Sequence, residues 1–258
     1  MHNAQLLPTV SIVIPTLNEA ENLPHILPDM PDIVSEVVLV DGGSKDNTIM
    51  VAKQLRPDIH IIRQTGKGKG NALAEGFAAS TGNIIVMMDA DGSHDPHEIL
   101  LFVDALMKGA DFAKGSRFIH DGASEDFTWI RQFGTSLINL LANACFRVQF
   151  TDLCYGYNAF WRRCLPYLDI DCPGFEVEAL MNIRACKAKL KVKEVPSFEA
   201  VRLFGESKLK ALHDGWRIVK TIVRERLGER RALYSSSTSS QMLESADKSY
   251  VKELEISK

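Results

Sequence analysis

Two acidic residues separated by one small residue, Asp89 and Asp91, follow an unbroken apolar run in this chain. The run, residues 84–88, is too short for an independent helix and is typical of a strand buried on both faces. In extended backbone, residues two apart point to the same side, so both carboxylates can reach one cation. Paired hard oxygen ligands suit Mg²⁺ or Mn²⁺, which complete their shell with water and phosphate oxygens. The motif therefore predicts a site for a divalent metal and a diphosphate.

A simpler interpretation of the same motif is a turn. Asp91 and Gly92 would end the strand, and residues 93–95 would cap a helix that begins at Pro96. Short acidic motifs are frequent in loops, so the metal prediction depends on the elements around the motif.

Strands and helices alternate through the first half of the chain. Apolar runs predict strands at 10–14, 37–40, 60–62 and 84–88, and the segments between them predict helices from about residue 20, at 46–54 and at 71–79. Parallel neighbours need helical crossovers, so this order predicts a single α/β domain with a mostly parallel, doubly wound sheet. Ligands of such sheets bind beyond the carboxyl ends of the strands. Glu19, Asp41 and the Asp89/Asp91 pair all follow strand ends, and we expect them to converge on one cleft.

The second half predicts helices at 96–107, 128–147, 175–188 and 213–226, with strands at 111–114 and 192–195 and an extended segment at 198–201. Helix 128–147 carries a wide apolar stripe that fits either core packing or contact with a membrane; its members are Phe133, Leu137, Leu140, Leu141 and Ala144. In helix 213–226, Trp216, Val219, Val223 and Leu227 share one side, and we expect the charges opposite them to be solvated.

The glycine-rich segment GKGKG, residues 66–70, precedes a predicted helix. Such a loop could hold a phosphate through its amides, with Lys67 and Lys69 beside it. It matches neither the P-loop nor the GxGxxG pattern, so a flexible basic loop is the alternative.

The composition of the 258 residues is that of an ordinary globular protein, with 45% hydrophobic and 24% charged residues. A net charge of −3 argues against nucleic acid as a partner. The five cysteines form no CxxC pair and suggest reduced thiols in the cytoplasm. No apolar run approaches the roughly 18 residues of a spanning helix, so we expect any membrane contact to be peripheral. Residues 228–258 include a serine-rich stretch and predict a disordered tail after a domain at 10–227.

Several motifs occur together in a specific order: PTLNE at 15–19, VVLVDGGSKDNT at 37–48, GKGNALAEG at 68–76, MMDADGSHDP at 87–96 and GSRF at 115–118. In this order they resemble glycosyltransferase family 2. FGESKL at 204–209 narrows the resemblance to the branch of dolichyl- and polyprenyl-phosphate mannose synthases. The resemblance spans roughly residues 10–227 and implies a GT-A fold, a Rossmann-like sheet flanked by helices.

The resemblance also implies roles for individual residues. Those expected to line the base and ribose pocket are Pro15, Leu17, Glu19 and Asp41, and those expected to hold the nucleotide-sugar and its Mg²⁺ or Mn²⁺ are Asp89, Ala90 and Asp91. Arg117, Arg202 and Lys208 match cations near the diphosphate and the acceptor phosphate, and Arg131 matches a second acceptor-phosphate arginine.

This chain departs from the family pattern in two respects. Gly92 and Ser93 follow the acidic pair where members often have Leu-Gln or Leu-Ser, so a glutamine metal ligand would be replaced by Ser93 or water. The sequence also lacks the C-terminal transmembrane hairpins of some members. We therefore expect the acceptor to arrive through a surface helix or a membrane partner protein, at the cytoplasmic face of a membrane.

The implied reaction is an inverting transfer from GDP-mannose or a UDP-sugar to a polyprenyl or dolichyl phosphate. A phosphate monoester is already anionic at neutral pH, so it needs positioning by arginines more than a base. Arg117 and Arg131 fit that role, while Asp91 with its metal, Arg202 and Lys208 would stabilise the leaving diphosphate.

Other functions are also compatible with parts of the sequence. A sugar hydroxyl as acceptor would need a base, with Asp152 as first candidate and Glu176 and Glu178 behind it, although we expect Asp152 to cap its own turn. A sugar nucleotidyltransferase would carry a glycine-rich signature after residues 10–14, which is missing. A non-catalytic subunit could bind a membrane protein through helix 128–147, but the intact acids and cations argue against it.

Overall fold

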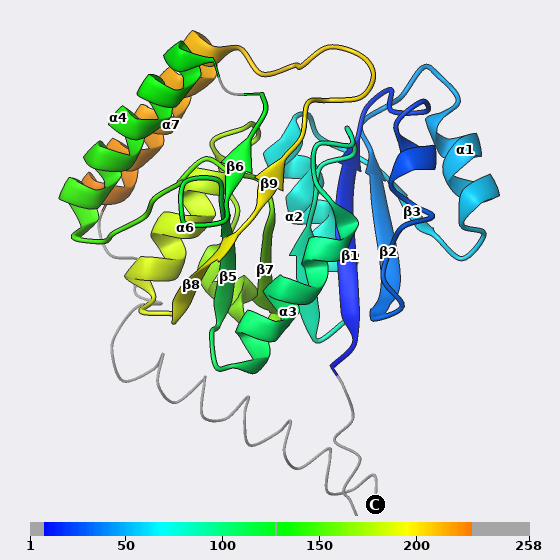
Figure 1. Cartoon of the computed structure of the whole chain (residues 1–258), viewed down its shortest axis with the longest axis horizontal. Coiled ribbons are helices and arrows are strands. Elements are labelled where there is room, and N and C mark those ends of the chain that lie inside the picture. Colours follow the sequence, from blue (N-terminus) through cyan, green and yellow to red (C-terminus); the bar gives the residue numbers. More distant parts are fainter. Residues whose placement is uncertain (1–7, 127, 229–258) are drawn as a thin grey trace, which may run out of the picture.

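A computed structural model describes residues 8–126 and 128–228, so most of the predicted tail at 228–258 lies outside the described residues. Its centre is a seven-stranded sheet with the order β3-β2-β1-β4-β7-β5-β8 (Figure 1). The strands of this sheet are β1 (Val10–Thr16), β2 (Val34–Asp41), β3 (His60–Arg63), β4 (Ile84–Met87), β5 (Phe112–Ser116), β7 (Asn158–Trp161) and β8 (Val192–Pro196). A second sheet pairs β6 (Ala123–Ser124) with β9 (Phe198–Glu199).

The large sheet is mostly parallel, which confirms the predicted fold class. β1 pairs in parallel with β2 and β4, and β5 pairs in parallel with β8. The exception is β7, which lies antiparallel between β4 and β5. No local pattern predicted this strand, because its four residues follow a mixed polar and aromatic segment without a helical crossover.

Helices flank the sheet, and most begin within two or three residues of the predicted positions. They are α1 (Thr48–Leu55), α2 (Lys69–Ala79), α3 (Ile99–Met107), α4 (Trp129–Phe146), α5 (Leu165–Leu168), α6 (Val177–Lys187) and α7 (Ala211–Leu227), with 3₁₀ turns η1 (Leu23–His25), η2 (Pro96–Glu98) and η3 (Arg162–Cys164). The helix predicted from residue 20 is wrong: only the turn η1 forms there. Pro28 has no N–H to donate to the carbonyl of Pro24, which prevents an α-helix from continuing.

Side chains on alternate positions of β1 enter different cores, as the period of a strand requires. Ile12 and Ile14 pack with η1 and α3, whereas Val13 packs with α2 and α6 on the other face. The sheet is therefore buried on both faces, and its carboxyl edge is the place where polar side chains can gather.

Two helices, α4 and α7, lie side by side at one edge of the molecule and pack on α6 (Figure 1). The core between them includes Ala142, Ile183, Ile218 and Ile222. The apolar stripe predicted on α4 faces outward: Phe133 is 68% exposed and Leu140 is 66% exposed. Core packing is thus the wrong interpretation for Phe133, Leu137, Leu140 and Ala144, and Leu141 alone of the stripe contacts this core.

The expectation for α7 is also corrected. Its apolar side is largely exposed, including Trp216 and Leu227, while Glu225 on another side is buried. Glu225 accepts from Arg184 at 2.8 Å and Lys187 at 2.6 Å, both on α6. The side of α7 that packs against α6 therefore contains Glu225, which pairs with the cations of α6, together with the core residues Ile218 and Ile222. Among the described helices, none is both long and apolar enough to cross a membrane.

Candidate functional site

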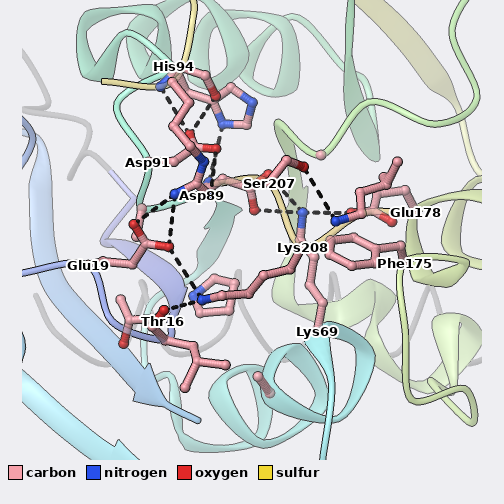
Figure 2. A pocket seen from close by; sticks show the side chains of 18 of the residues that line it. Thr16, Glu19, Lys69, Asp89, Asp91, His94, Phe175, Glu178, Ser207 and Lys208 are labelled. Atoms are coloured by element: carbon pink, nitrogen blue, oxygen red, sulfur yellow. Dashed lines mark hydrogen bonds and ion pairs between the residues drawn. The ribbon is translucent and has the colours of Figure 1, made fainter. Parts of the chain in front are cut away.

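A cavity of about 730 Å³ opens at the carboxyl edge of the sheet, beyond the ends of β1 and β4 (Figure 2). The structure brings together around it nearly all of the predicted site residues, namely Pro15, Leu17, Glu19, Asp89, Ala90, Asp91, Arg117, Arg131, Arg202 and Lys208. Asp41 is not among the lining residues. It is fully buried, and its carboxylate accepts the amides of Gly43 and Ser44 at 3.1 Å, which fixes the turn beside the cavity.

The acidic pair lies where β4 turns away from the sheet. Asp91 accepts both the amide of Ser93 at 3.0 Å and its hydroxyl at 2.6 Å. Gly92 between them has φ +80°, in the left-handed region that favours glycine, and a Cβ there would lie 2.5 Å from Leu203. Gly92 therefore satisfies the geometry of this turn, and the turn is the scaffold that presents the two carboxylates.

Each carboxylate of the pair contacts a cation from a different element. Lys69 Nζ, at the start of α2, lies 2.6 Å from Asp89 Oδ1, and Arg202 Nη2 lies 3.2 Å from Asp91 Oδ2. Burial raises the pKa of the Asp89 carboxyl, but the surrounding positive charges, Lys69 first, and the hydrogen bond from Lys69 together outweigh burial, so the net shift is downward. Asp89 can therefore remain ionised at neutral pH with its charge compensated by Lys69.

Lys69 also contacts Glu178 of α6 at 2.7 Å. Burial disfavours the charged form of Lys69, yet the attraction of Asp89 and Glu178 raises its pKa. Burial raises the pKa of Glu178, and Lys69 opposes that shift. Figure 2 shows the lysine reaching between the two carboxylates.

The loop before α2 positions this lysine. The amide of Gly70 donates to the carbonyl of Pro173 at 3.0 Å, and Gly68 has φ +85° beside the same segment. Lys67 is exposed, whereas the side chain of Lys69 is only 10% exposed. Both lysines of the GKGKG segment line the cavity, but only Lys69 is enclosed and held between two carboxylates.

Glu19, on the opposite side of the cavity, forms ion pairs with two cations. Its carboxylate lies 3.1 Å from Arg202 and 4.0 Å from Lys208, and the side-chain amide of Asn22 donates to it at 2.5 Å. Burial raises the pKa of Glu19, against the effect of Arg202. Lys208 also donates to the carbonyl of Leu17.

The segment at 200–210, between β9 and α7, carries Arg202 and Lys208 across the cavity. Its backbone is fixed at both sides: the amide of Leu203 donates to the carbonyl of Asp91 at 3.1 Å, and that of Phe204 donates to Asn22 at 3.0 Å. The ring of Phe204 stacks on His25 of η1. The segment therefore joins the acidic turn to the turn after β1.

Arg117, at the end of β5, is held by two acids. It binds Asp152 at 2.7 and 2.9 Å, and Glu199 at 2.9 Å. The prediction that Asp152 caps its own turn is wrong, because its fully buried carboxylate accepts the guanidinium instead. Burial raises the pKa of Asp152, but the hydrogen bonds and charge of Arg117, together with the charge of Lys114, outweigh burial and lower it. A base for a sugar hydroxyl needs an accessible carboxylate, so the geometry does not support that role for Asp152.

Arg131, in the first turn of α4, lines the cavity at its end near that helix. It pairs with Asp126, and its side chain is 31% exposed. It is thus more accessible than Arg117, whose side chain is 6% exposed.

Sequence reasoning missed the role of His94. Its Nδ1 accepts the amide of Asp89 at 3.2 Å, and its ring stacks on Tyr157 with centroids 4.7 Å apart. Burial lowers the pKa of His94, which favours the neutral ring that this bond requires. The histidine stands three residues after Asp91 in the same motif, and that spacing was the available signal.

The oxygen atoms of Asp89 and Asp91 fit a hard divalent cation. Within residues 8–126 and 128–228, no group of three or more acids, histidines or cysteines could hold a metal by itself. A cation here would therefore need oxygens from water, from Ser93 or from a ligand, as Mg²⁺ sites commonly do.

Comparison with known proteins identifies relatives that cover most of the chain. A polyprenol monophosphomannose synthase of Mycolicibacterium smegmatis is 35% identical over 211 residues, which are 77% of this chain and 80% of the relative. An undecaprenyl-phosphate mannosyltransferase of Micrococcus luteus is 32% identical over 78% of this chain and 87% of its own length. A dolichol-phosphate mannosyltransferase of Pyrococcus furiosus is 33% identical over 78% of this chain, but over only 59% of its own length.

Solved structures share the fold. Glucosyl-3-phosphoglycerate synthase from Mycobacterium tuberculosis, in complex with Mn²⁺, UDP and glucosyl-3-phosphoglycerate, superposes with a TM-score of 0.67 over 87% of this chain and 82% of that one, at 24% identity. The same enzyme with Mg²⁺ and UDP gives a TM-score of 0.68 at 22% identity. The predicted GT-A fold is therefore confirmed. The model of the family described as Glycosyl transferase family 2 matches residues 11–167, and the chain belongs to that family.

Proposed function

We propose that this protein transfers a sugar from a nucleotide-diphosphate-sugar to a polyprenyl or dolichyl phosphate. The main support for this proposal is that one cavity is lined by three kinds of group. These are an acidic pair, two cations on the segment at 200–210, and an accessible arginine beside an exposed apolar helix. The names of the three relatives, which are mannosyl transferases of polyprenyl or dolichyl phosphates, support the same acceptor class.

The donor would occupy the part of the cavity beyond β1. Pro15, Leu17 and Glu19 would contact the base and ribose, and Asp41 would support them through the turn that it fixes. GDP-mannose and UDP-sugars are the candidate donors. Arg202 and Lys208, which already meet at Glu19, would bind the diphosphate and stabilise the charge that develops as it leaves.

Asp89 and Asp91 would hold Mg²⁺ or Mn²⁺, with Ala90 between them beside the donor. Such an ion supplies Lewis-acid stabilisation of the diphosphate. The chain's own contribution is to orient the two carboxylates. His94 fixes the backbone of Asp89, and Ser93 fixes the side chain of Asp91.

The acceptor phosphate would bind at the end of the cavity near α4. Arg131 is accessible there, and Arg117 lies in the same wall with its guanidinium shared between Asp152 and Glu199. We therefore assign the direct phosphate contact first to Arg131, with Arg117 as the second arginine. A phosphate monoester needs no base to become a nucleophile, which agrees with the buried state of Asp152.

The lipid part of the acceptor implies contact with a membrane surface. Arg131 stands two residues from Trp129, which is 78% exposed at the start of the apolar stripe of α4. The adjacent helix α7 exposes a second stripe, made of Leu212, Trp216, Val223 and Leu227. Amphipathic faces of this kind lie in the interface of a bilayer. We propose peripheral attachment through α4 and α7 at the cytoplasmic face, which would bring the lipid phosphate to Arg131.

The first test is thermal stabilisation by GDP- and UDP-sugars, each with Mn²⁺, Mg²⁺ or a chelator. A ligand that binds only the folded chain raises its melting temperature, so the donor should give a metal-dependent shift. The same donor, labelled in its sugar, should then label a polyprenyl phosphate. Asp91→Ala should abolish this transfer while the melting temperature without ligand changes little. Absence of any shift would favour a non-catalytic subunit, and full activity of the Asp91 variant would refute the metal assignment.

A further inference from the structure

The acidic pair and its two cations form a repeated arrangement. Lys69 lies between Asp89 and Glu178, at 2.6 and 2.7 Å. Arg202 lies between Asp91 and Glu19, at 3.2 and 3.1 Å. Each cation therefore has one partner in the acidic pair and one partner on a separate element.

The two kinds of partner differ in exposure. The side chains of Glu178 and Glu19 are 4% and 7% exposed, whereas those of Asp89 and Asp91 are 30% and 18% exposed. All four acids line the cavity, but the glutamates are more enclosed by protein than the aspartates. A ligand that enters the cavity can reach the aspartates and compete there with Lys69 and Arg202.

We propose that Lys69 and Arg202 are exchangeable counter-ions: a divalent cation displaces them from Asp89 and Asp91, and they then bind the donor diphosphate while Glu178 and Glu19 retain them. This inference rests on the proposed function and assigns Lys69 as a donor-binding residue.

The net charge of the site is the same before and after this exchange. Without ligands, four carboxylates surround the two cations. The divalent ion then adds two positive charges, and the diphosphate of the nucleotide-sugar adds two negative charges. Each ligand also assists the other: the metal frees N–H donors of Lys69 and Arg202 for the diphosphate, and the diphosphate holds these two competitors away from Asp89 and Asp91. Metal and diphosphate should therefore strengthen each other's binding, by the same factor in each direction.

Lys69 can make this exchange without leaving its place. An ammonium has three N–H donors, so it can keep Glu178 and replace Asp89 by a phosphate oxygen. Gly156 provides the necessary space: a Cβ there would lie 2.9 Å from Lys69 Nζ, 3.1 Å from Asp89 Oδ2 and 3.4 Å from Glu178 Oε1. A glycine at this position leaves the region around all three charges open.

The test measures Mn²⁺ binding by calorimetry, first alone and then with saturating GDP or UDP, on the whole chain. In Lys69→Met the competitor for Asp89 is gone, so Mn²⁺ alone should bind on the order of tenfold more tightly, a typical coupling between linked sites. The nucleotide should bind more weakly to the Mn²⁺ form, and the mutual enhancement should shrink. Lys53→Met removes an exposed lysine of α1 that does not line the cavity and should leave both affinities near those of the wild type.

A second variant should change the affinity for Mn²⁺ in the opposite direction. Glu178→Gln leaves Lys69 with Asp89 as its remaining charged partner, so Mn²⁺ alone should bind severalfold more weakly. Damage to the fold would weaken Mn²⁺ binding in both variants, so opposite signs support the exchange. Unchanged or weaker Mn²⁺ binding by Lys69→Met would overturn it. If the wild type binds nucleotide with Mn²⁺ while Lys69→Met keeps the full mutual increase in Mn²⁺ and nucleotide affinity, the counter-ion exchange is refuted, but the proposed function is not. If the wild type binds neither GDP nor UDP, the proposed function fails with it.

Discussion

Arg117 and Asp152 form a two-point ion pair, with Nε 2.7 Å from one carboxylate oxygen and Nη2 2.9 Å from the other. The amide of Arg117 donates to the same carboxylate at 3.2 Å. The pair joins the end of β5 to the segment before β7, and both side chains are buried. It thus fixes the wall of the cavity that faces α4.

Breaking this pair should destabilise the fold. Asp152→Asn keeps the shape of the side chain but leaves the buried guanidinium with less negative charge around it. Removal of one partner of a buried ion pair costs roughly 3 kcal/mol or more. Urea unfolding measures this loss. Asp104→Asn, which breaks the exposed pair with Lys108, is the matched control and should cost less than about 0.5 kcal/mol. Equal effects of the two variants would contradict the structural role of Asp152.

The stability should depend on pH through the same carboxyl. The pKa of Asp152 is lower in the folded chain than its ordinary value of 3.8, because the hydrogen bonds and charge of Arg117, together with the charge of Lys114, outweigh burial. A carboxyl with a lowered pKa stabilises the fold above its ordinary pKa, and this contribution is lost as the pH falls through the folded pKa. The difference in unfolding free energy between the wild type and Asp152→Asn should thus be full at neutral pH and narrow below pH 3.8. A difference that stays constant or widens toward acid would contradict this assignment.

Arg131 should affect the acceptor and not the donor. Arg131→Ala removes the accessible guanidinium at the end of the cavity near α4. Hydrogen bonds to charged groups contribute about 1.5–3 kcal/mol, so KM for the polyprenyl phosphate should rise roughly tenfold to a hundredfold. Nucleotide affinity, measured by calorimetry, should be unchanged. Gln132→Ala, at the exposed neighbouring position of α4, is the control. A loss of nucleotide affinity in Arg131→Ala would place this arginine at the donor instead.

The exposed stripes should bind membranes. Replacing Trp129 and Trp216 by serine removes the two largest exposed side chains of α4 and α7. Sedimentation with vesicles that contain anionic phospholipid should show severalfold weaker binding, because aromatic side chains at the interface supply much of the affinity of amphipathic helices. Leu100→Ser on α3, where the leucine is 49% exposed, is the control. Binding that is lost equally in the Leu100 variant, or kept in the double variant, would refute attachment through α4 and α7.

Much of the fold and the acidic site followed from local patterns. The apolar run of β4 and the spacing of Asp89 and Asp91 predicted both the strand and the shared direction of the carboxylates. Periodicity was less informative on α7, since it groups Trp216 with Val223 but does not say which side faces the protein. That choice depended on Arg184 and Lys187 of α6, which meet Glu225 only in the folded chain.

The partners of the predicted cations could not be derived in the same way. Arg117 and Asp152 are 35 residues apart, and Arg202 and Glu19 are 183 apart, so no local pattern links them. The sequence motifs predicted that Arg117, Arg202 and Glu19 belong to the nucleotide-sugar and acceptor site, but not which charged groups they contact. The structure shows which charged side chains pair with each other. This pairing explains why Arg117 is buried while Arg131 remains accessible.

The segment at 200–210 should be sensitive to trypsin. It is exposed over most of its length and contains Arg202, Lys208 and Lys210, each a point of cleavage for trypsin. Its backbone is anchored near the acidic turn and η1, whereas residues 205–208 reach across the cavity toward α7. A diphosphate that binds Arg202 and Lys208 would hold both side chains away from the protease. If the donor binds there as proposed, the rate at which trypsin separates α7 from the sheet should fall as the donor part of the cavity fills.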